Sequence, residues 1–154
     1  MQYDLSVLIP ARNEEFLKNT VDDLLKNKRG STEIIVGCDG GWPMVPLEQH
    51  PDLTVFYTPV SIGQRAITKQ CARLARGKYI QKSDAHCSFD EGWDVEMLKM
   101  FEKEGDNIVG APNMKNLFVF EWVCPCGKRV YQDKKSVCTC GKQMTKEIVW
   151  KAKR

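Results

Sequence analysis

Short, nearly continuous apolar runs recur along the first two-thirds of the chain and alternate with segments of helical periodicity. The first run, YDLSVLIPA, has too few polar positions for a strand with one face in water, so it is typical of a strand buried on both faces of a parallel sheet. Glycine and proline bound the later runs. The predicted strands cover residues 3–11, 32–41, 53–59 and 78–83, with a further strand at 107–112.

Apolar residues spaced three or four positions apart predict helices between these strands. The first helix covers residues 14–28 and is followed by Gly30, the second covers about 61–76, and the third runs from Trp93 to near Glu104. The alternation of strands and helices indicates an α/β fold. We expect a mainly parallel sheet flanked by helices on both faces and joined by right-handed crossovers.

The pattern changes after Pro112, where short apolar strands alternate with two Cys-rich turns. Predicted strands at 117–123, 128–132 and 143–150 indicate a small antiparallel element of hairpins. We therefore expect two parts, a domain of residues 1–113 and a C-terminal element of residues 114–154.

Charge separates the same two parts of the chain. The net charge of +3 is the sum of −4 over residues 1–106 and +7 over residues 107–154. The basic segment is either solvated surface or attracts a polyanion such as nucleic acid. No apolar run reaches the roughly 20 residues of a membrane span, and the N-terminus has no secretory signal pattern, so a cytoplasmic protein is expected.

Three predicted strand ends are polar, and ligands bind at the carboxyl ends of strands in open parallel sheets. The ends are residues 10–15, 38–41 and 84–86. In an extended segment, Asp84 and His86 would leave the chain on the same side and could hold one divalent cation, Mn²⁺ in preference to Ca²⁺. The alternative is that Asp84 caps a turn or helix and His86 is a satisfied polar residue.

The other two ends also have structural alternatives. Asp39 before two glycines is either a turn residue or a carboxylate that accepts from a nucleobase N–H. In PARNEE, Glu14 follows Asn13 in what reads as a helix cap and first turn. Arg12 and Arg65 are candidate phosphate partners or ordinary surface residues.

The segments LSVLIPARNEE, EIIVGCDGG and GKYIQKSDAHCSFDEGWDVEML, taken in this order, resemble the nucleotide-sugar half of a family 2 glycosyltransferase with the GT-A fold. The last segment is particularly similar to the polypeptide N-acetylgalactosaminyltransferases, whose metal motif is Asp-x-His-Cys followed by Trp and an apolar helix. The resemblance covers roughly residues 4–112.

The resemblance implies roles for the residues at the strand ends. Asp84 and His86 would act in catalysis by holding Mn²⁺ or Mg²⁺ against the diphosphate of a nucleotide-sugar donor, and Asp39 would recognise uracil. The other residues expected to contact the donor are Pro10, Ala11, Arg12, Glu14 and Arg65. The histidine that completes the family's metal shell and the acceptor half have no counterpart after His86, so the chain is expected to be a fragment or a minimal form.

Four of the seven cysteines lie in two Cys-x-Cys-Gly turns, CPCGK and CTCGK, and resemble a zinc ribbon. Four thiolates from Cys124, Cys126, Cys138 and Cys140 would make a closed structural Zn²⁺ site. Two disulfides or four unliganded thiols are the alternatives. We expect the remaining cysteines, Cys38, Cys71 and Cys87, to be small buried residues.

Three functions therefore compete. The first is a metal-dependent glycosyltransferase that uses a nucleotide-diphospho sugar, most simply a UDP-sugar, with an unidentified acceptor that is anionic or a nucleic acid. The second is a sugar-nucleotide nucleotidyltransferase, which would need a Gly-rich first loop that PARNEE does not supply. The third is a zinc-ribbon module that binds nucleic acid, attached to a catalytically silent domain.

Overall fold

The computed structural model describes residues 3–106, 108–110, 114–116, 118–131 and 136–151. The chain divides into two compact units, Met1–Lys115 and Asn116–Arg154. We call them the N-terminal unit and the C-terminal unit and describe each by itself.

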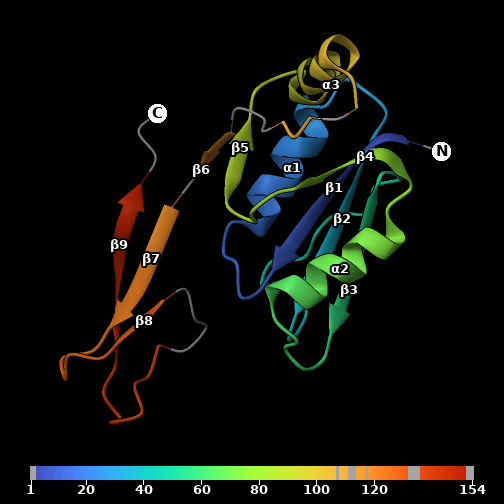
Figure 1. The fold of residues 1–154 in the computed structure, drawn as a ribbon. Helices are drawn as coiled ribbons and strands as arrows, with labels where there is room; N and C mark the ends of the chain where they lie inside the picture. The colour runs from blue at the N-terminus through green and yellow to red at the C-terminus, as the bar shows by residue number, and fades with distance from the viewer. Residues whose placement is uncertain (1–2, 107, 111–113, 117, 132–135, 152–154) are drawn as a thin grey trace. The chain divides into compact units, whose positions relative to one another are not determined.

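The N-terminal unit is built on a parallel sheet of four strands in the order β3-β2-β1-β4 (Figure 1). The strands are β1 (Tyr3–Ala11), β2 (Thr32–Asp39), β3 (Leu53–Thr58) and β4 (Gly77–Lys82). The two central strands are buried along most of their length, because helices cover both faces of the sheet. The α/β architecture and the parallel sheet predicted from the apolar runs are confirmed.

Helices α1 (Leu17–Asn27) and α2 (Gln64–Leu74) cover opposite faces of this sheet (Figure 1). Alternate residues of β1 separate the two cores: Val7 and Ile9 pack with α1, whereas Leu8 packs with Cys71 of α2. The approach of α2 is close because residue 37 is glycine. A Cβ at Gly37 would lie 2.7 Å from the Cys71 sulfur and 2.8 Å from Ile67.

An ion pair between the buried Glu33 and the exposed Arg76 fixes the point at which β4 enters the sheet. Glu33 of β2 is almost fully buried and accepts hydrogen bonds from Ser6, from the Arg76 backbone and from the Arg76 guanidinium. Gly77 follows directly and packs against β1, where a Cβ would lie 2.6 Å from the Ser6 nitrogen. The start of β4 is therefore set by contacts from two other strands.

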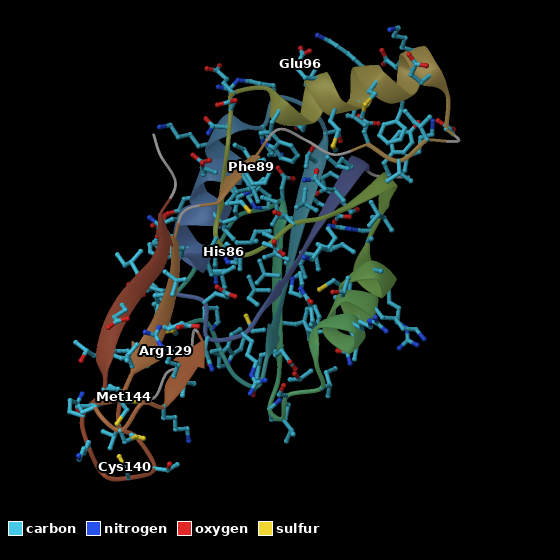
Figure 2. The ribbon with its side chains drawn as sticks, turned by 60° about the vertical axis from the view of Figure 1, so that its left-hand side comes forward. His86, Phe89, Glu96, Arg129, Cys140 and Met144 are labelled. Carbon is cyan, nitrogen blue, oxygen red and sulfur yellow. The ribbon has the colours of Figure 1, made fainter. Side chains whose placement is uncertain are left out.

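Helix α3 (Trp93–Glu104) is held by a buried carboxylate in its first turn. Asp94 accepts hydrogen bonds from the backbone nitrogens of Arg29 and Gly30 and from the hydroxyl of Thr32. Just before α3, Phe89 packs on Trp93 with a ring separation of 4.9 Å (Figure 2). Strand β5 (Cys87–Phe89) ends there and pairs with β6 (Met114–Asn116).

The strand predicted at 107–112 is wrong for the part that the structure describes. Residues 108–110 form no strand, and Val109 is fully exposed, while 107 and 111–112 lie outside the described residues. The physical reason is a competing contact, because Gly110 lies against the Met100 side chain of α3. Helices α1 and α2 also begin three residues later than predicted, because the residues before them form loops at the strand ends.

The C-terminal unit contains a three-stranded antiparallel sheet in the order β8-β7-β9, as the hairpin pattern predicted. Its strands are β7 (Phe118–Val123), β8 (Arg129–Tyr131) and β9 (Thr145–Lys151). Within the described part of this unit, the core beside the sheet consists of Cys124, Cys138 and Met144, with Trp122 and Val130 packed around them. In neither unit do the described residues include a helix long and apolar enough to cross a membrane.

Candidate functional site

A pocket of about 230 Å³ opens where the carboxyl ends of β1 and β2 lie side by side. Five of its lining residues were predicted as donor contacts, and the other three come from α2 and the loop before it. The lining is Pro10, Ala11, Arg12, Glu14, Asp39, Gly63, Gln64 and Ile67. The predicted Arg65 is exposed and does not line the pocket, whereas its neighbour Gln64 does.

Asp39 forms one wall of the pocket and fixes the loop that precedes α2. Its carboxylate accepts hydrogen bonds from the Ser61 hydroxyl at 2.7 Å, from the nitrogens of Ile62 and Gly63 at 2.6 and 3.0 Å, and from Thr58 at 3.4 Å. Burial alone would raise the pKa of Asp39, but these donors outweigh it and hold the pKa below its usual value. Asp39 is therefore ionised at neutral pH, and its carboxylate oxygens already have four donors.

The first and third strand ends meet through Glu14 and His86. His86, labelled in Figure 2, lies in the loop that follows β4. Its Nδ1 atom lies 3.3 Å from a carboxylate oxygen of Glu14. This hydrogen bond raises the pKa of His86 above its ordinary value, although burial opposes it. No spacing in the sequence predicts the pair, because loop 12–16 and loop 83–86 become neighbours only in the folded sheet.

Thr20 of α1 fixes the chain just after His86. Its hydroxyl accepts from the Cys87 nitrogen at 2.9 Å and lies 3.0 Å from the Cys87 oxygen, to which it donates. These contacts attach the start of β5 to the helix that follows Glu14. The position of the imidazole is therefore set by backbone contacts on one side and by a carboxylate on the other.

Asp84 is placed differently from the sequence expectation. Because β4 ends at Lys82, Asp84 and His86 lie in a loop and turn, not on one face of an extended strand. The partly exposed Asp84 carboxylate forms an ion pair with Lys82. It still lies close enough for its charge to raise the pKa of His86, after the larger effect of Glu14.

The donor set at Asp84 and His86 suits a cation that is shared with a phosphorylated ligand. Among the described residues, the only group of three or more His, Cys, Asp or Glu ligand atoms close enough to surround an ion is the cysteine cluster. Mg²⁺ and similar ions commonly bind to one or two protein groups and take their other oxygens from substrate phosphates and water. One carboxylate and one imidazole oriented by Glu14 fit that requirement.

An exposed aromatic pair that sequence reasoning missed lies beyond Asp39. Trp42 and Tyr57 are 57% and 43% exposed, with ring centroids 4.5 Å apart. Trp42 also borders a shallow hollow of about 690 Å³ against the loop before β3. The available signal was a tryptophan directly after the Gly-Gly turn of a polar strand end.

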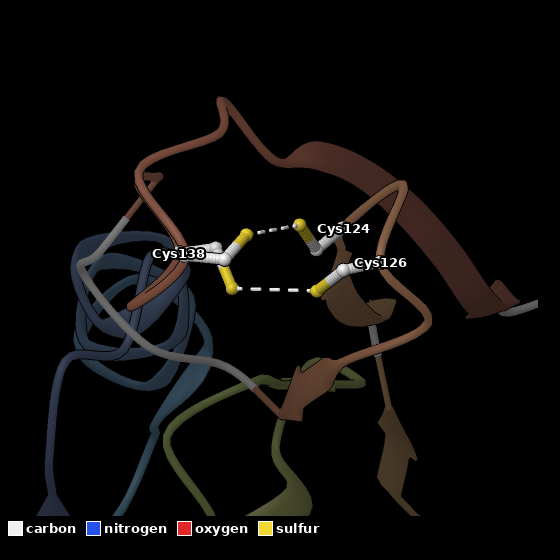
Figure 3. A group of neighbouring side chains, drawn as sticks. Cys124, Cys126 and Cys138 are labelled. Carbon is white, nitrogen blue, oxygen red and sulfur yellow. Dashed lines mark hydrogen bonds between the residues drawn. The ribbon is translucent and has the colours of Figure 1, made fainter.

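The four C-terminal cysteines that the sequence singled out converge in the C-terminal unit. Their sulfur atoms all lie within 4.8 Å of one another (Figure 3). This set could hold a metal ion. Cys38, Cys71 and Cys87 are buried, as expected.

Comparisons with known proteins agree with this architecture. A family model described as glycosyl transferase family 2 matches residues 6–123. The crystal structure of S. aureus TarS is similar with a TM-score of 0.54 at 13% identity, covering 71% of this chain and 23% of that one. The crystal structure of S. aureus TarS 1-349 is similar with a TM-score of 0.52 at 15% identity, covering 71% of this chain and 38% of that one.

At these identities the likeness to solved structures shows the fold alone. The chain spans between about a quarter and two-fifths of the length of the structures it matches. No curated protein matches it.

Proposed function

This chain belongs to glycosyl transferase family 2, and on that premise we propose that it binds a UDP-sugar and takes part in transferring the sugar to an acceptor with divalent metal assistance. The observation that carries the proposal is the pocket at the carboxyl ends of β1 and β2. Five of the residues expected at a nucleotide-sugar site line it together. Open α/β sheets bind their ligands at this edge.

The pocket supplies complementary groups for a nucleotide. The ionised Asp39 accepts the N–H of the base once one of its present donors, such as Ser61 or Thr58, gives way. Arg12, exposed at the rim, contributes a guanidinium that can pair with phosphate oxygens. Because the pocket is small, we expect it to hold the base, while the diphosphate extends toward Asp84.

In this proposal Asp84 and His86 hold Mn²⁺ or Mg²⁺ at the diphosphate. The order Asp-x-His-Cys at residues 84–87, which resembles the metal motif of the polypeptide N-acetylgalactosaminyltransferases, supports the same assignment. When bound, the ion stabilises the negative charge that develops on the departing nucleotide. Glu14 holds His86 through Nδ1, which leaves Nε2 as the ligand atom.

In the overall transfer, an acceptor hydroxyl oxygen becomes bonded to the anomeric carbon of the sugar and gives its proton to solvent or to a base of the acceptor region. The bond from that carbon to the β-phosphate oxygen breaks, and its electron pair leaves with UDP. Lys82, which forms an ion pair with Asp84, would supply a positive charge near the residues that would hold the ion. The protein groups named here bind and orient the donor.

Calorimetric titration of UDP with and without Mn²⁺ tests the proposal on the wild-type chain, Asp84→Asn and Asp90→Asn. We expect Mn²⁺ to tighten UDP binding by about tenfold or more in the wild type and to have no effect in Asp84→Asn. Asp90→Asn removes the same charge from an exposed position in the same segment and should behave as the wild type. Equal UDP affinity of the wild type with and without Mn²⁺ would contradict metal-assisted donor binding.

The alternative is a nucleic-acid-binding module on a silent domain, for which the net charge of +7 over residues 107–154 is the supporting observation. It is less well supported because Arg129 is already paired with Glu121 and Glu147. This alternative predicts salt-sensitive binding of DNA or RNA together with no affinity for UDP.

A further inference from the structure

The C-terminal unit contains two matched turns that each present a pair of cysteines. In the first, the Cys124 nitrogen donates to the Lys128 oxygen at 2.9 Å and the Gly127 nitrogen to the Cys124 oxygen at 2.8 Å. In the second, Cys138, Lys142 and Gly141 repeat both bonds at 2.9 Å. Both glycines have positive φ, 89° and 81°, a conformation that side chains with a Cβ seldom adopt. The two turns are therefore copies of one ligand-bearing motif.

Two of the sulfur–sulfur distances match those around a tetrahedral ion and are too long for disulfide bonds. Cys124 and Cys140 have sulfurs 3.5 Å apart, and Cys126 and Cys138 have sulfurs 3.7 Å apart (Figure 3). Four sulfurs at about 2.3 Å from a central Zn²⁺ lie about 3.8 Å from one another. Bonded sulfurs would be separated by only about 2.0 Å.

Backbone amides point at the sulfurs as they do at a thiolate site. The Cys126 amide is hydrogen-bonded to the Cys124 sulfur, and the Cys140 amide to the Cys138 sulfur. Such N–H donors stabilise sulfur that carries negative charge. The backbone of the two turns is therefore arranged to stabilise thiolates.

The same cysteines make up half of the buried apolar residues in the described part of the unit. Cys124 and Cys138 are buried, as are Phe120 and Met144. Since the four cysteines of this core form no disulfide, we expect a bound metal to hold the two turns together.

We propose that Cys124, Cys126, Cys138 and Cys140 bind one Zn²⁺ in a closed structural site, and that the C-terminal unit folds only with this ion, whereas the N-terminal unit folds without it. The thiols release their protons as the four Zn–S bonds form, and no electron transfer is involved. With four protein ligands the ion has no open position, so it serves the fold and not sugar transfer.

Elemental analysis and hydrogen exchange on the full chain, purified under reducing conditions, test this proposal. We expect about one zinc per chain. After chelation, the backbone amides of β7 and β9 should lose protection while those of β1 and β2 keep theirs, and added Zn²⁺ should restore the difference. Replacement by Co²⁺ should give the visible absorption of a tetrahedral thiolate site.

Cys138→Ser should lower the zinc content from about one to near zero per chain, whereas Cys71→Ser, a change of a buried cysteine in the N-terminal unit, should leave it unchanged. Three outcomes would overturn the proposal. They are one zinc per chain retained in Cys138→Ser, iron in place of zinc, and full protection of β7 and β9 in the chelated, reduced wild type.

Discussion

At the scale of single residues, the site depends on carboxylates that act through other groups. Asp39 holds the loop of Ser61–Gly63, so it shapes the pocket in addition to any contact with the base. Glu14 likewise acts through a neighbouring group, because its carboxylate is hydrogen-bonded to the His86 imidazole. The family resemblance implied that Asp39 and Glu14 are site residues, whereas the strand-end pattern alone left a turn residue and a first helical turn as alternatives. That pattern could not predict these partners, since each contact joins segments that are distant in sequence.

Glu14→Ala should separate the orientation of His86 at the proposed cation site from the metal-free binding of UDP. Without the carboxylate the imidazole of His86 loses its orientation, and we expect most of the Mn²⁺-dependent gain in UDP affinity to be lost. UDP affinity measured without metal should change little. Titration calorimetry measures both quantities, with Glu48→Gln as a control at an exposed carboxylate.

A loss of UDP affinity in Glu14→Ala that is equal with and without Mn²⁺ would argue against this role. Glu14 would then serve the shape of the pocket, which it also lines.

At the scale of elements, close contacts between strands and helices fix the geometry that the sequence pattern only outlines. Apolar runs located all four strands of the parallel sheet, because strands buried on both faces carry a strong signal. The sequence pattern places the starts of α1 and α2 three residues before their positions in the structure, since polar loop residues at the strand ends resemble a first helical turn. No sequence pattern predicts the hydrogen bonds that Asp94 of α3 accepts from the loop before β2 and from the first residue of β2, Thr32.

Gly77→Ala tests the seating of β4 against β1. The added Cβ would lie 2.6 Å from the Ser6 nitrogen and 2.7 Å from the Leu5 carbonyl carbon, and neither backbone atom can move without shifting the strand. We expect a loss of about 1–3 kcal/mol in the free energy of unfolding, measured by urea denaturation.

The control for this change is Gly105→Ala at the end of α3. There a Cβ meets no atom within 4 Å, so the cost is confined to the positive φ of 81°. If the two variants lose equal stability, the contact between β4 and β1 is not the cause.

At the scale of the whole molecule, buried carboxylates make the N-terminal unit sensitive to acid. Burial would raise the pKa of Glu33, but hydrogen bonds from Ser6 and Arg76 lower it below its usual value. The pKa of Asp52 is lowered chiefly by its hydrogen bond from Lys28. Both groups bind protons more readily in the unfolded chain, so their stabilising effect is complete at neutral pH and is lost as the pH falls through the folded pKa values.

We therefore expect the urea midpoint of the N-terminal unit to fall steeply below about pH 4, where unfolded carboxyl groups begin to bind protons. Glu33→Gln should be less stable than the wild type at neutral pH and should show a shallower decline in acid. Fluorescence-monitored unfolding at a series of pH values measures both. Parallel pH profiles for the two proteins would show that Glu33 is not a source of the acid sensitivity.

The strand order β3-β2-β1-β4 also determines when the sheet can close during protein synthesis. Ser6 and Gly77 meet across β1 and β4 although they are 71 positions apart in the chain. At 5–20 residues per second, a ribosome takes roughly 4–14 s to extend the chain over that interval. During that time β1, which is buried along most of its length in the folded sheet, lacks its β4 partner, so the nascent chain is open to aggregation or chaperone binding before β4 emerges.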